Sequence, residues 1–318
     1  SMNRHPICAT FVATVGAMLA LASATAVARK PGGGTGPYNP EIAYTRTQGS
    51  AASVYLANAD GSNPVVVYSR RSGGVGRVDF VPGGGPSGGR LVFGSTLGSI
   101  SVLTYTASAS GINTTNVKLL VPEGPPIFSI DVSADGLYVL YTVYNGDNTN
   151  TLKVTPVNGG WVKTIATGTF QNAVWSHDLT RIAVLDGFES VGPYPQQIKM
   201  LTLNALFELV GTAPPVYTSP CSTCRVNDIE YARTTDSVIF SASTTNSTRE
   251  MFVVDANSPA AVTGYGVGYI PCFNADDSKI LYRNPADSLL YVFRPSDLSR
   301  TKVTSVGVNS SDFMPKAP

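Results

Sequence analysis

Short apolar stretches separated by polar turns follow one another along most of the chain, and from Glu41 onward they recur in the same order. Each unit starts with an aromatic or apolar residue at a turn, followed by an apolar alternating strand and by further strands that end in polar turns. In the unit at residues 127–168, Asp135-Gly136 predicts a hairpin turn and residues 137–144 predict the buried strand after it. The pattern predicts an all-β fold.

The residue that begins each unit, here called the anchor, recurs at intervals of roughly 40 to 55 positions, a spacing typical of repeat architectures. The anchors are Phe80, Val132, Trp175, Tyr231 and Phe273. The two longer intervals contain insertions, at 83–89 with 106–115 and at 188–195 with 211–220.

A sixth unit is divided between the two ends of the repeat region. Residues 41–71 supply its second, third and fourth strands, and Asp312–Pro315 supplies the first, because Phe313-Met314-Pro315 matches Phe80-Val81-Pro82. A unit divided in this way closes a ring, whereas an open solenoid needs capping repeats. A two-sheet sandwich explains the strands but not the period or the divided unit. We therefore predict a six-bladed β-propeller with four antiparallel strands per blade, closed by the C-terminal strand.

The repeat resembles the TolB-like propeller family, whose units are also described as WD40-like or PD40 repeats. The likeness lies in residues 55–64, in Trp175-Ser176-His177-Asp178 and in residues 273–277, and it extends over residues 41–316. It implies the fold but no single function, because such repeats occur in periplasmic scaffolds, peptidase propellers and polysaccharide lyases. Residues 29–40 stand where TolB has an α/β domain and no hydrolase domain is expected after the propeller, so neither a Tol-system role nor a peptidase role is carried over.

The N-terminal residues have the layout of a secretory signal peptide. Arg4 precedes an apolar run from Ile7 to Leu21, and small residues at Ala24–Ala26 and Ala26–Ala28 fit cleavage after Ala26 or Ala28. The alternative is a membrane anchor, but the run is short for a span of about 20 apolar residues. We assign residues 1–28 to the signal, with Ser1 left by cloning, 29–40 to a Pro/Gly-rich linker and 41–318 to the propeller. The protein is then periplasmic or secreted from a bacterium, with no membrane span after cleavage.

Charge and cysteine content narrow the classes of partner. With 22 basic and 21 acidic residues and no basic cluster, the chain offers no electrostatic surface for nucleic acid. Cys221 and Cys224 lie in a Pro- and Ser-rich loop, where we expect a short disulfide, with redox or zinc chemistry as the alternative. Cys272 lies in a strand pattern and is expected to be a small buried hydrophobe.

Motifs for catalysis are sparse, so we predict no catalytic residue. We leave the question of enzyme activity open and favour a protein without it. His177 is the only histidine after the signal, and it occupies a turn beside Ser176 and Asp178. Nucleophilic catalysis needs a base and an orienting group that converge in space. No nucleophile elbow, phosphate loop or dinucleotide fingerprint is present. Arg77 and Arg225 are left as candidates for a lyase.

The residue directly before each anchor forms a second candidate set. Four of these positions carry carboxylates on the innermost strands, at Asp79, Asp131, Glu230 and Asp312; the other two hold Val174 and Cys272. In one interpretation the four side chains form a ring in the central channel that holds Ca²⁺ or a basic group. In the other, which we prefer, they turn between blades and accept hydrogen bonds. No cofactor is required, and Ca²⁺ is the one candidate.

Tyrosines in inserted or loop segments supply the remaining candidates, because exposed tyrosines suit glycan stacking and protein contact. They are Tyr105, Tyr194, Tyr217, Tyr265 and Tyr269. Tyrosine also fits pleated strands, which is the simpler explanation. The sequence thus predicts an exported, non-catalytic scaffold that binds an envelope or extracellular protein or glycan through one face or its loops. The alternative is a polysaccharide lyase-like enzyme that uses the central channel.

Overall fold

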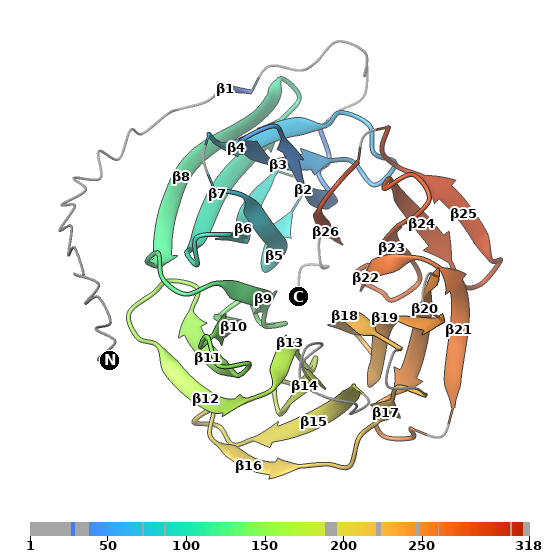
Figure 1. Cartoon of the computed structure of the whole chain (residues 1–318). Helices are drawn as coiled ribbons and strands as arrows, with labels where there is room; N and C mark the ends of the chain where they lie inside the picture. The colour runs from blue at the N-terminus through green and yellow to red at the C-terminus, as the bar shows by residue number, and fades with distance from the viewer. Residues whose placement is uncertain are drawn as a thin grey trace, which may run out of the picture.

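Six antiparallel sheets stand around a central channel in the computed structural model (Figure 1). The structure describes residues 27–28, 38–71, 73–85, 87–187, 196–220, 224–245, 248–259, 261–305 and 307–313. The predicted signal peptide therefore lies outside the described residues, apart from Val27–Ala28, and so does the linker before Tyr38. The described part of the chain contains no helix long and apolar enough to cross a membrane.

Each sheet is one blade of four main strands, listed here from the channel outward. Blade 1 consists of β26 (Ser310–Phe313), β2 (Ile42–Gln48), β3 (Ala51–Ala57) and β4 (Val65–Arg70). Blade 2 consists of β5 (Val75–Gly85), β6 (Gly88–Ser95), β7 (Ile100–Ser108) and β8 (Gly111–Val121), with β1 (Val27–Ala28) on its outer edge. Blade 3 consists of β9 (Ile127–Val132), β10 (Tyr138–Tyr144), β11 (Asn150–Pro156) and β12 (Lys163–Gly168).

The other three blades follow the same order. Blade 4 consists of β13 (Phe170–Trp175), β14 (Arg181–Asp186), β15 (Gln197–Leu203) and β16 (Leu209–Thr212), with β17 (Tyr217–Thr218) also on β15. Blade 5 consists of β18 (Val226–Tyr231), β19 (Ser237–Thr245), β20 (Thr248–Asp255) and β21 (Val262–Val267). Blade 6 consists of β22 (Tyr269–Phe273), β23 (Ile280–Arg283), β24 (Leu290–Arg294) and β25 (Ser299–Lys302).

The C-terminal strand closes the ring as the divided repeat predicts. β26 pairs with β2 in the register Ile42↔Phe313 to Thr45↔Ser310, so the two ends of the repeat region share one sheet. The strand begins at Ser310, two residues earlier than the sequence indicates, while Met314 and Pro315 lie outside the described residues. The predicted six-bladed propeller is confirmed.

Apolar side chains from adjacent blades form the core between them. One cluster joins Val92 and Ile100 of blade 2 to Val132 and Tyr141 of blade 3, and all four residues are buried. The fit is close at Gly94, where an added Cβ would lie 2.5 Å from Cδ1 of Ile130 in the next blade. Alternation along each strand therefore buries one row of side chains against each neighbouring blade.

The turns that follow the innermost strands explain the aspartates in the repeat. In blade 3, the Asp135 carboxylate accepts hydrogen bonds from the Leu137 amide (3.0 Å) and the Ser133 hydroxyl (2.6 Å). Gly136 has φ +70°, and a Cβ there would lie 2.8 Å from the Pro82 carbonyl oxygen of blade 2. The predicted hairpin turn is present, and its glycine is required by both backbone angle and contact.

The insertions of blade 2 are extensions of its strands rather than free loops. β5 and β6 continue through the 83–89 segment to the pair Gly85↔Gly88, and β7 and β8 continue through 106–115 to Ser108↔Gly111. Blade 2 consequently has the longest hairpins among the described blades. The 188–195 insertion lies outside the described residues.

Candidate functional site

The six innermost strands β26, β5, β9, β13, β18 and β22 surround the channel (Figure 1). We call the side of the propeller on which these strands end the end face, and the opposite side the start face. Residues two positions apart on one of these strands point to the same side of their sheet. Successive channel-facing side chains therefore form layers along the channel.

Three of the predicted carboxylates connect neighbouring blades by hydrogen bonds. Asp312 of blade 1 accepts from the Phe80 amide of blade 2 (2.9 Å), and Asp79 of blade 2 accepts from the Val132 amide of blade 3 (2.5 Å). Asp131 of blade 3 accepts from the Trp175 amide of blade 4 (2.6 Å). In each case the donor is the anchor of the next blade. These three residues therefore follow the second interpretation of the sequence, in which the carboxylates bind between blades.

A guanidinium group from blade 5 lies among the same carboxylates. Nη2 of Arg233, just beyond the end of β18, lies 3.1 Å from Glu230, 3.3 Å from Asp312 and 4.0 Å from Asp79. The Arg233 side chain is 13 % exposed, so these ion pairs are only weakly screened by water. A basic group thus does lie among the carboxylates, and the chain itself supplies it.

A carboxylate from blade 6 holds the backbone at Arg233 in place. The Asp277 carboxylate accepts hydrogen bonds from the Arg233 amide (2.8 Å), the Thr234 amide (2.8 Å) and the Thr234 hydroxyl (2.6 Å). Sequence reasoning missed Arg233. The available signal was an arginine two positions after the Tyr231 anchor, where Phe80 and Phe313 are followed by proline.

The channel environment changes the acidity of its carboxyl groups. Burial raises the pKa of Asp131 to about 6 and the pKa of Glu230 to about 8. Burial, followed by the charge of Asp312, raises the pKa of Asp79 well above its ordinary value. Burial alone would lower the pKa of Arg233, but the surrounding carboxylates outweigh it and raise the pKa, so Arg233 remains cationic. Near neutral pH the cluster therefore holds protons as well as charge.

A second ion pair crosses the channel nearer the start face. Arg77 of β5 pairs with Asp228 of β18, and these strands belong to blades 2 and 5, on opposite sides of the ring. Arg77 lies two residues before Asp79, and Asp228 lies two residues before Glu230, so the two ion-pair layers are adjacent. Arg77, a lyase candidate, is thus engaged in a contact across the channel.

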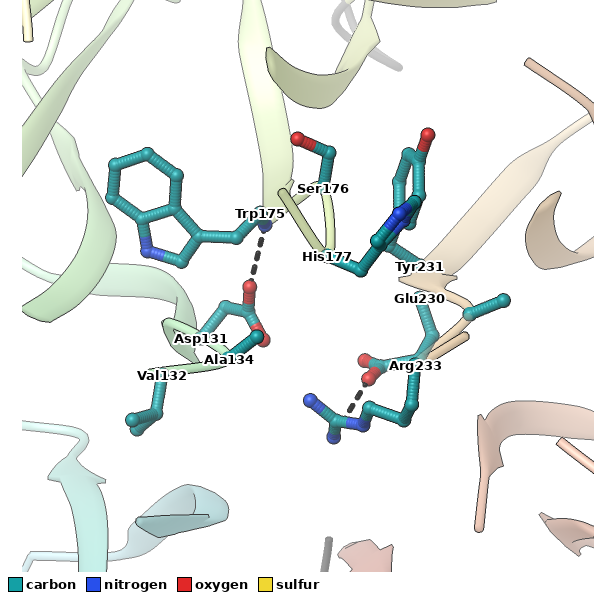
Figure 2. A pocket seen from close by; sticks show the side chains of 10 residues that line it. Asp131, Val132, Ala134, Trp175, Ser176, His177, Glu230, Tyr231 and Arg233 are labelled. Carbon is teal, nitrogen blue, oxygen red and sulfur yellow. Dashed lines mark hydrogen bonds and ion pairs between the residues drawn. The ribbon is translucent and has the colours of Figure 1, made fainter. Parts of the chain in front are cut away.

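A small pocket opens where β9, β13 and β18 end (Figure 2). Asp131, Glu230 and Arg233 line it together with Ser176, His177 and Tyr231. Nδ1 of His177 lies 3.8 Å from Asp236, which accepts hydrogen bonds from the Tyr231 hydroxyl (2.7 Å) and from Arg181 (2.7 Å). His177 therefore belongs to a polar network between blades 4 and 5.

Beside this pocket, aromatic and aliphatic side chains form an exposed surface that sequence reasoning missed. Trp161, Val162 and Leu206 are 44 %, 52 % and 66 % exposed. Trp161 lies against Phe207 (6.2 Å between ring centroids), and Phe207 in turn contacts Tyr138 (4.7 Å). We call these five residues the end-face patch. The available signal was an apolar pair inside each of two polar turns, at 161–162 and 206–207.

The end-face patch is continuous with the channel pocket. Trp175, the anchor of blade 4, lines the pocket and lies 5.7 Å from the Phe207 ring. Lys163 of blade 3 donates a hydrogen bond to the Leu206 carbonyl oxygen of blade 4 and pairs with Glu208 (3.5 Å). The patch therefore spans two blades and has a charged edge, as protein-binding surfaces do.

Comparisons with known proteins show which solved structures share this fold. No family model and no curated protein matches the sequence. Solved structures do match: TolB from Acinetobacter baumannii aligns over 88 % of this chain and 68 % of its own, with TM-score 0.67 and 15 % identity. A TolB-type protein from Agrobacterium tumefaciens aligns over 87 % and 99 %, with TM-score 0.59 and 11 % identity. The chain therefore has the β-propeller fold that these TolB structures share. The WD40 domain of coronin from Toxoplasma gondii also aligns, over 86 % and 70 %, with TM-score 0.50 and 14 % identity.

The predicted tyrosines take different positions in the propeller. Tyr105 is 1 % exposed on β7, so the expectation that it is an exposed loop residue is wrong. Its strand continues through the predicted insertion and pairs it with Gly89, which leaves room for the ring. Tyr217 packs on Phe240 (4.5 Å) and Tyr265 on Phe293 (5.2 Å); both are half-buried. Tyr269 is half-buried at the start face, and Tyr194 lies outside the described residues.

The remaining candidates are the cysteines and the possible metal ligands. Cys224 is disulfide-bonded, while its predicted partner Cys221 lies outside the described residues. Cys272 is a buried thiol outside any disulfide, as expected. Within the described ranges, no three histidine, cysteine or acidic side chains are arranged to hold a metal ion. Between Glu230, Asp312 and Asp79, the guanidinium of Arg233 supplies the positive charge that Ca²⁺ would bring.

Proposed function

We propose that this TolB-like propeller is an exported, non-catalytic scaffold that binds a protein through its end face. The observation that carries the proposal is the end-face patch. A tryptophan, a leucine and a valine are exposed together on an aromatic base, next to a polar pocket. Tryptophan is among the residues that contribute most to protein interfaces, and exposed apolar groups of this kind mark interaction sites.

The channel groups are engaged with one another and with the backbone, which does not favour chemistry there. Asp79, Asp131 and Asp312 are engaged with backbone amides, and Arg77 is engaged with Asp228. The rival function, a polysaccharide lyase-like enzyme, needs a base and charge-stabilising groups that are free to meet a substrate. These groups instead hold the blades together, so the lyase is the less favoured proposal.

Export is the second part of the proposal and rests on the sequence of residues 1–28. N-terminal sequencing of the protein recovered from its source cells tests it. We expect the first residue to be Val27 or Arg29, and recovery in the periplasmic or secreted fraction. An N-terminus at Met2, or recovery with the cytoplasm, would contradict export.

Comparative capture tests the binding surface. The wild type, a Trp161→Ala/Leu206→Ser variant and a Leu298→Ser variant are used as bait in envelope and secreted fractions, and bound proteins are quantified by mass spectrometry. Leu298 is the matched control, because it is 70 % exposed in the turn between β24 and β25, far around the ring from the patch. We expect one or more proteins that bind the wild type and the control but not the patch variant.

Two outcomes would overturn the proposal. If all three baits capture the same proteins, the end-face patch is not the binding surface. If the wild type instead releases unsaturated product from a uronic-acid polymer, followed by ultraviolet absorbance, the protein is an enzyme. Binding of the wild type to a glycan array, lost in the patch variant, would move the partner from protein to glycan.

A further inference from the structure

Two arginines share one tyrosine ring at the start face. Tyr269 is the first residue of β22, and the guanidinium carbons of Arg249 and Arg283 lie 5.1 Å and 4.8 Å from its ring centroid. Arg249 is exposed at the start of β20 in blade 5, and Arg283 is half-buried at the end of β23 in blade 6. The three side chains therefore form a stack across the joint between two blades.

Strand register and a close backbone contact produce this stack. Tyr269 and Arg283 are directly paired across β22 and β23. The Gly268 amide donates to the Arg249 carbonyl oxygen (3.0 Å), which brings the start of β22 against blade 5. A Cβ on Gly268 would lie 2.5 Å from Cδ2 of Tyr282, so this approach requires glycine. The stack is held by the backbone on both sides.

The positive charge of the stack is not balanced nearby. Among the residues that the structure describes, neither Arg249 nor Arg283 has a carboxylate within 4.0 Å, whereas Arg181 has Asp236 at 2.7 Å. The adjacent Glu250 points to the other side of its strand, because side chains alternate. Asp287, on the hairpin after Arg283, accepts instead from the Tyr291 hydroxyl (2.9 Å).

We propose that the Arg249–Tyr269–Arg283 stack binds carboxylates of an extended acidic segment of a protein. A guanidinium binds a carboxylate through two parallel hydrogen bonds, and stacking on an aromatic ring holds it ready to do so. The two guanidinium groups lie within about 10 Å of each other. Carboxylates two positions apart on an extended strand are about 7 Å apart and on the same side, which lies within this limit.

This acidic-segment site is independent of the end-face patch, because Tyr269 opens its innermost strand while the patch lies where those strands end. Either site can fail its test without affecting the other. The charge also differs: in the end-face pocket Arg233 lies with Asp131 and Glu230, whereas among the described residues the two arginines of the stack have no carboxylate partner.

Fluorescence anisotropy with two labelled peptides tests the site. One peptide alternates Ser and Asp, and the other has Asn in place of Asp. We expect the Asp peptide to bind the wild type at low salt and to bind Arg249→Gln and Arg283→Gln about tenfold more weakly, since each loses a charged hydrogen bond. Arg294→Gln, an exposed arginine at the opposite face, should bind as the wild type does, and so should Tyr269→Phe, which keeps the ring.

Three results would overturn the inference. The first is equal binding of the Asp and Asn peptides. The second is an equal loss of affinity in Arg294→Gln, which would indicate a general charge effect. The third is binding of polygalacturonate or inorganic sulfate, lost in Arg249→Gln, without binding of the Asp peptide; the ligand is then a different anion. Urea unfolding of each variant confirms that the propeller is intact.

Discussion

Blades 1 to 4 are joined by carboxylate–amide hydrogen bonds from the position directly before each anchor, whereas among the described residues this position forms no such bond at the joints between blades 4, 5, 6 and 1. The same repeat position holds Asp312, Asp79 and Asp131 in the first group, and Val174, Glu230 and Cys272 in the second. At the joint of blades 4 and 5, the buried Gln196 accepts from the Val226 amide (2.6 Å) instead.

The two remaining joints use different groups to satisfy the backbone. Between blades 5 and 6, Asp277 accepts from the Arg233 and Thr234 amides, so the carboxylate comes from a turn. Between blades 6 and 1, Cys272 donates a long hydrogen bond to the Ser311 carbonyl oxygen (3.9 Å). The fold therefore requires a satisfied backbone at each joint but not one particular residue.

Carboxylates of the first group also meet a cation from the opposite side of the channel. Three carboxylates lie on the side of blades 1 to 3, and the guanidinium that meets two of them comes from blade 5. Arg233 thus connects the two halves of the ring. Removing a group that connects the two halves of the ring should therefore lower the stability more than removing a contact within one half.

Removal of the closing strand should have the largest effect. Deleting residues 309–318 removes β26, its four register pairs with β2 and the Asp312 carboxylate. We expect loss of the cooperative transition in urea, because the effect is comparable to the roughly 5–15 kcal/mol stability of a whole domain. Deleting only 314–318 keeps β26 and should keep the transition. An unchanged midpoint in the longer deletion would contradict closure by β26.

Replacing the central cation should have the next largest effect. Arg233→Met leaves Glu230, Asp312 and Asp79 without their guanidinium, and breaking a buried ion pair in this way costs about 3–5 kcal/mol. Arg77→Met is the control; its pair with Asp228 is more exposed and should cost about 1 kcal/mol. Urea unfolding at pH 8 measures both, and equal losses would contradict a special role for Arg233.

Calcium binding gives a second test of the role of Arg233, made on the wild type and on Arg233→Met. In the wild type the guanidinium lies among the carboxylates, so millimolar Ca²⁺ should leave the melting temperature unchanged. In Arg233→Met the carboxylates lose their cation, and Ca²⁺ should raise the melting temperature by taking its place in the folded state. Stabilisation of the wild type would instead establish a calcium site beside Arg233.

The channel carboxyls should make the protein less stable as the pH rises. A carboxyl whose pKa is raised on folding binds its proton more tightly in the folded state. Its contribution is complete below the ordinary carboxyl pKa near 4 and is lost as pH rises through about 6 for Asp131 and about 8 for Glu230. The free energy of unfolding should fall by on the order of 5 kcal/mol between pH 5 and pH 9, because Glu230 and Asp131 together lose about four pKa units of stabilisation in this interval, each worth about 1.4 kcal/mol. Glu230→Gln should flatten the upper part of this profile; a profile that rises with pH would contradict the shifts.

Much of the fold could be predicted because it depends on local repetition. The anchors, the Asp135-Gly136 turn and the divided unit are all visible in the one-dimensional pattern. The extent of the hairpins could not be predicted, because the 106–115 segment has the composition of a loop but pairs as strand. Tyr105 was misplaced for this reason.

The site was predicted in part, because its residues come from different blades. The positions of Asp79, Asp131 and Asp312 before the anchors identify them as a set, but not their donors in the next blade. Arg233 reaches across the ring, and the end-face patch joins turns from blades 3 and 4. Such contacts depend on the curvature of the ring and the direction of each side chain, which no repeat alignment contains.

The comparison of the two groups of joints is sharpened by a pair of single substitutions. Asp131→Ala removes the acceptor of the buried Trp175 amide and should cost about 2 kcal/mol. Cys272→Ala, at the same position of blade 6, removes one sulfur atom and a 3.9 Å contact and should cost about 1 kcal/mol or less.

Asp131→Asn separates the two roles of the carboxylate, because its amide oxygen still accepts from Trp175 while the titrating group is lost. It should keep most of the stability at pH 7 and remove the part of the pH profile near 6, as urea unfolding can measure. If Asp131→Asn is as unstable as Asp131→Ala, the charge near Arg233 holds this joint, and the hydrogen bond between blades is secondary.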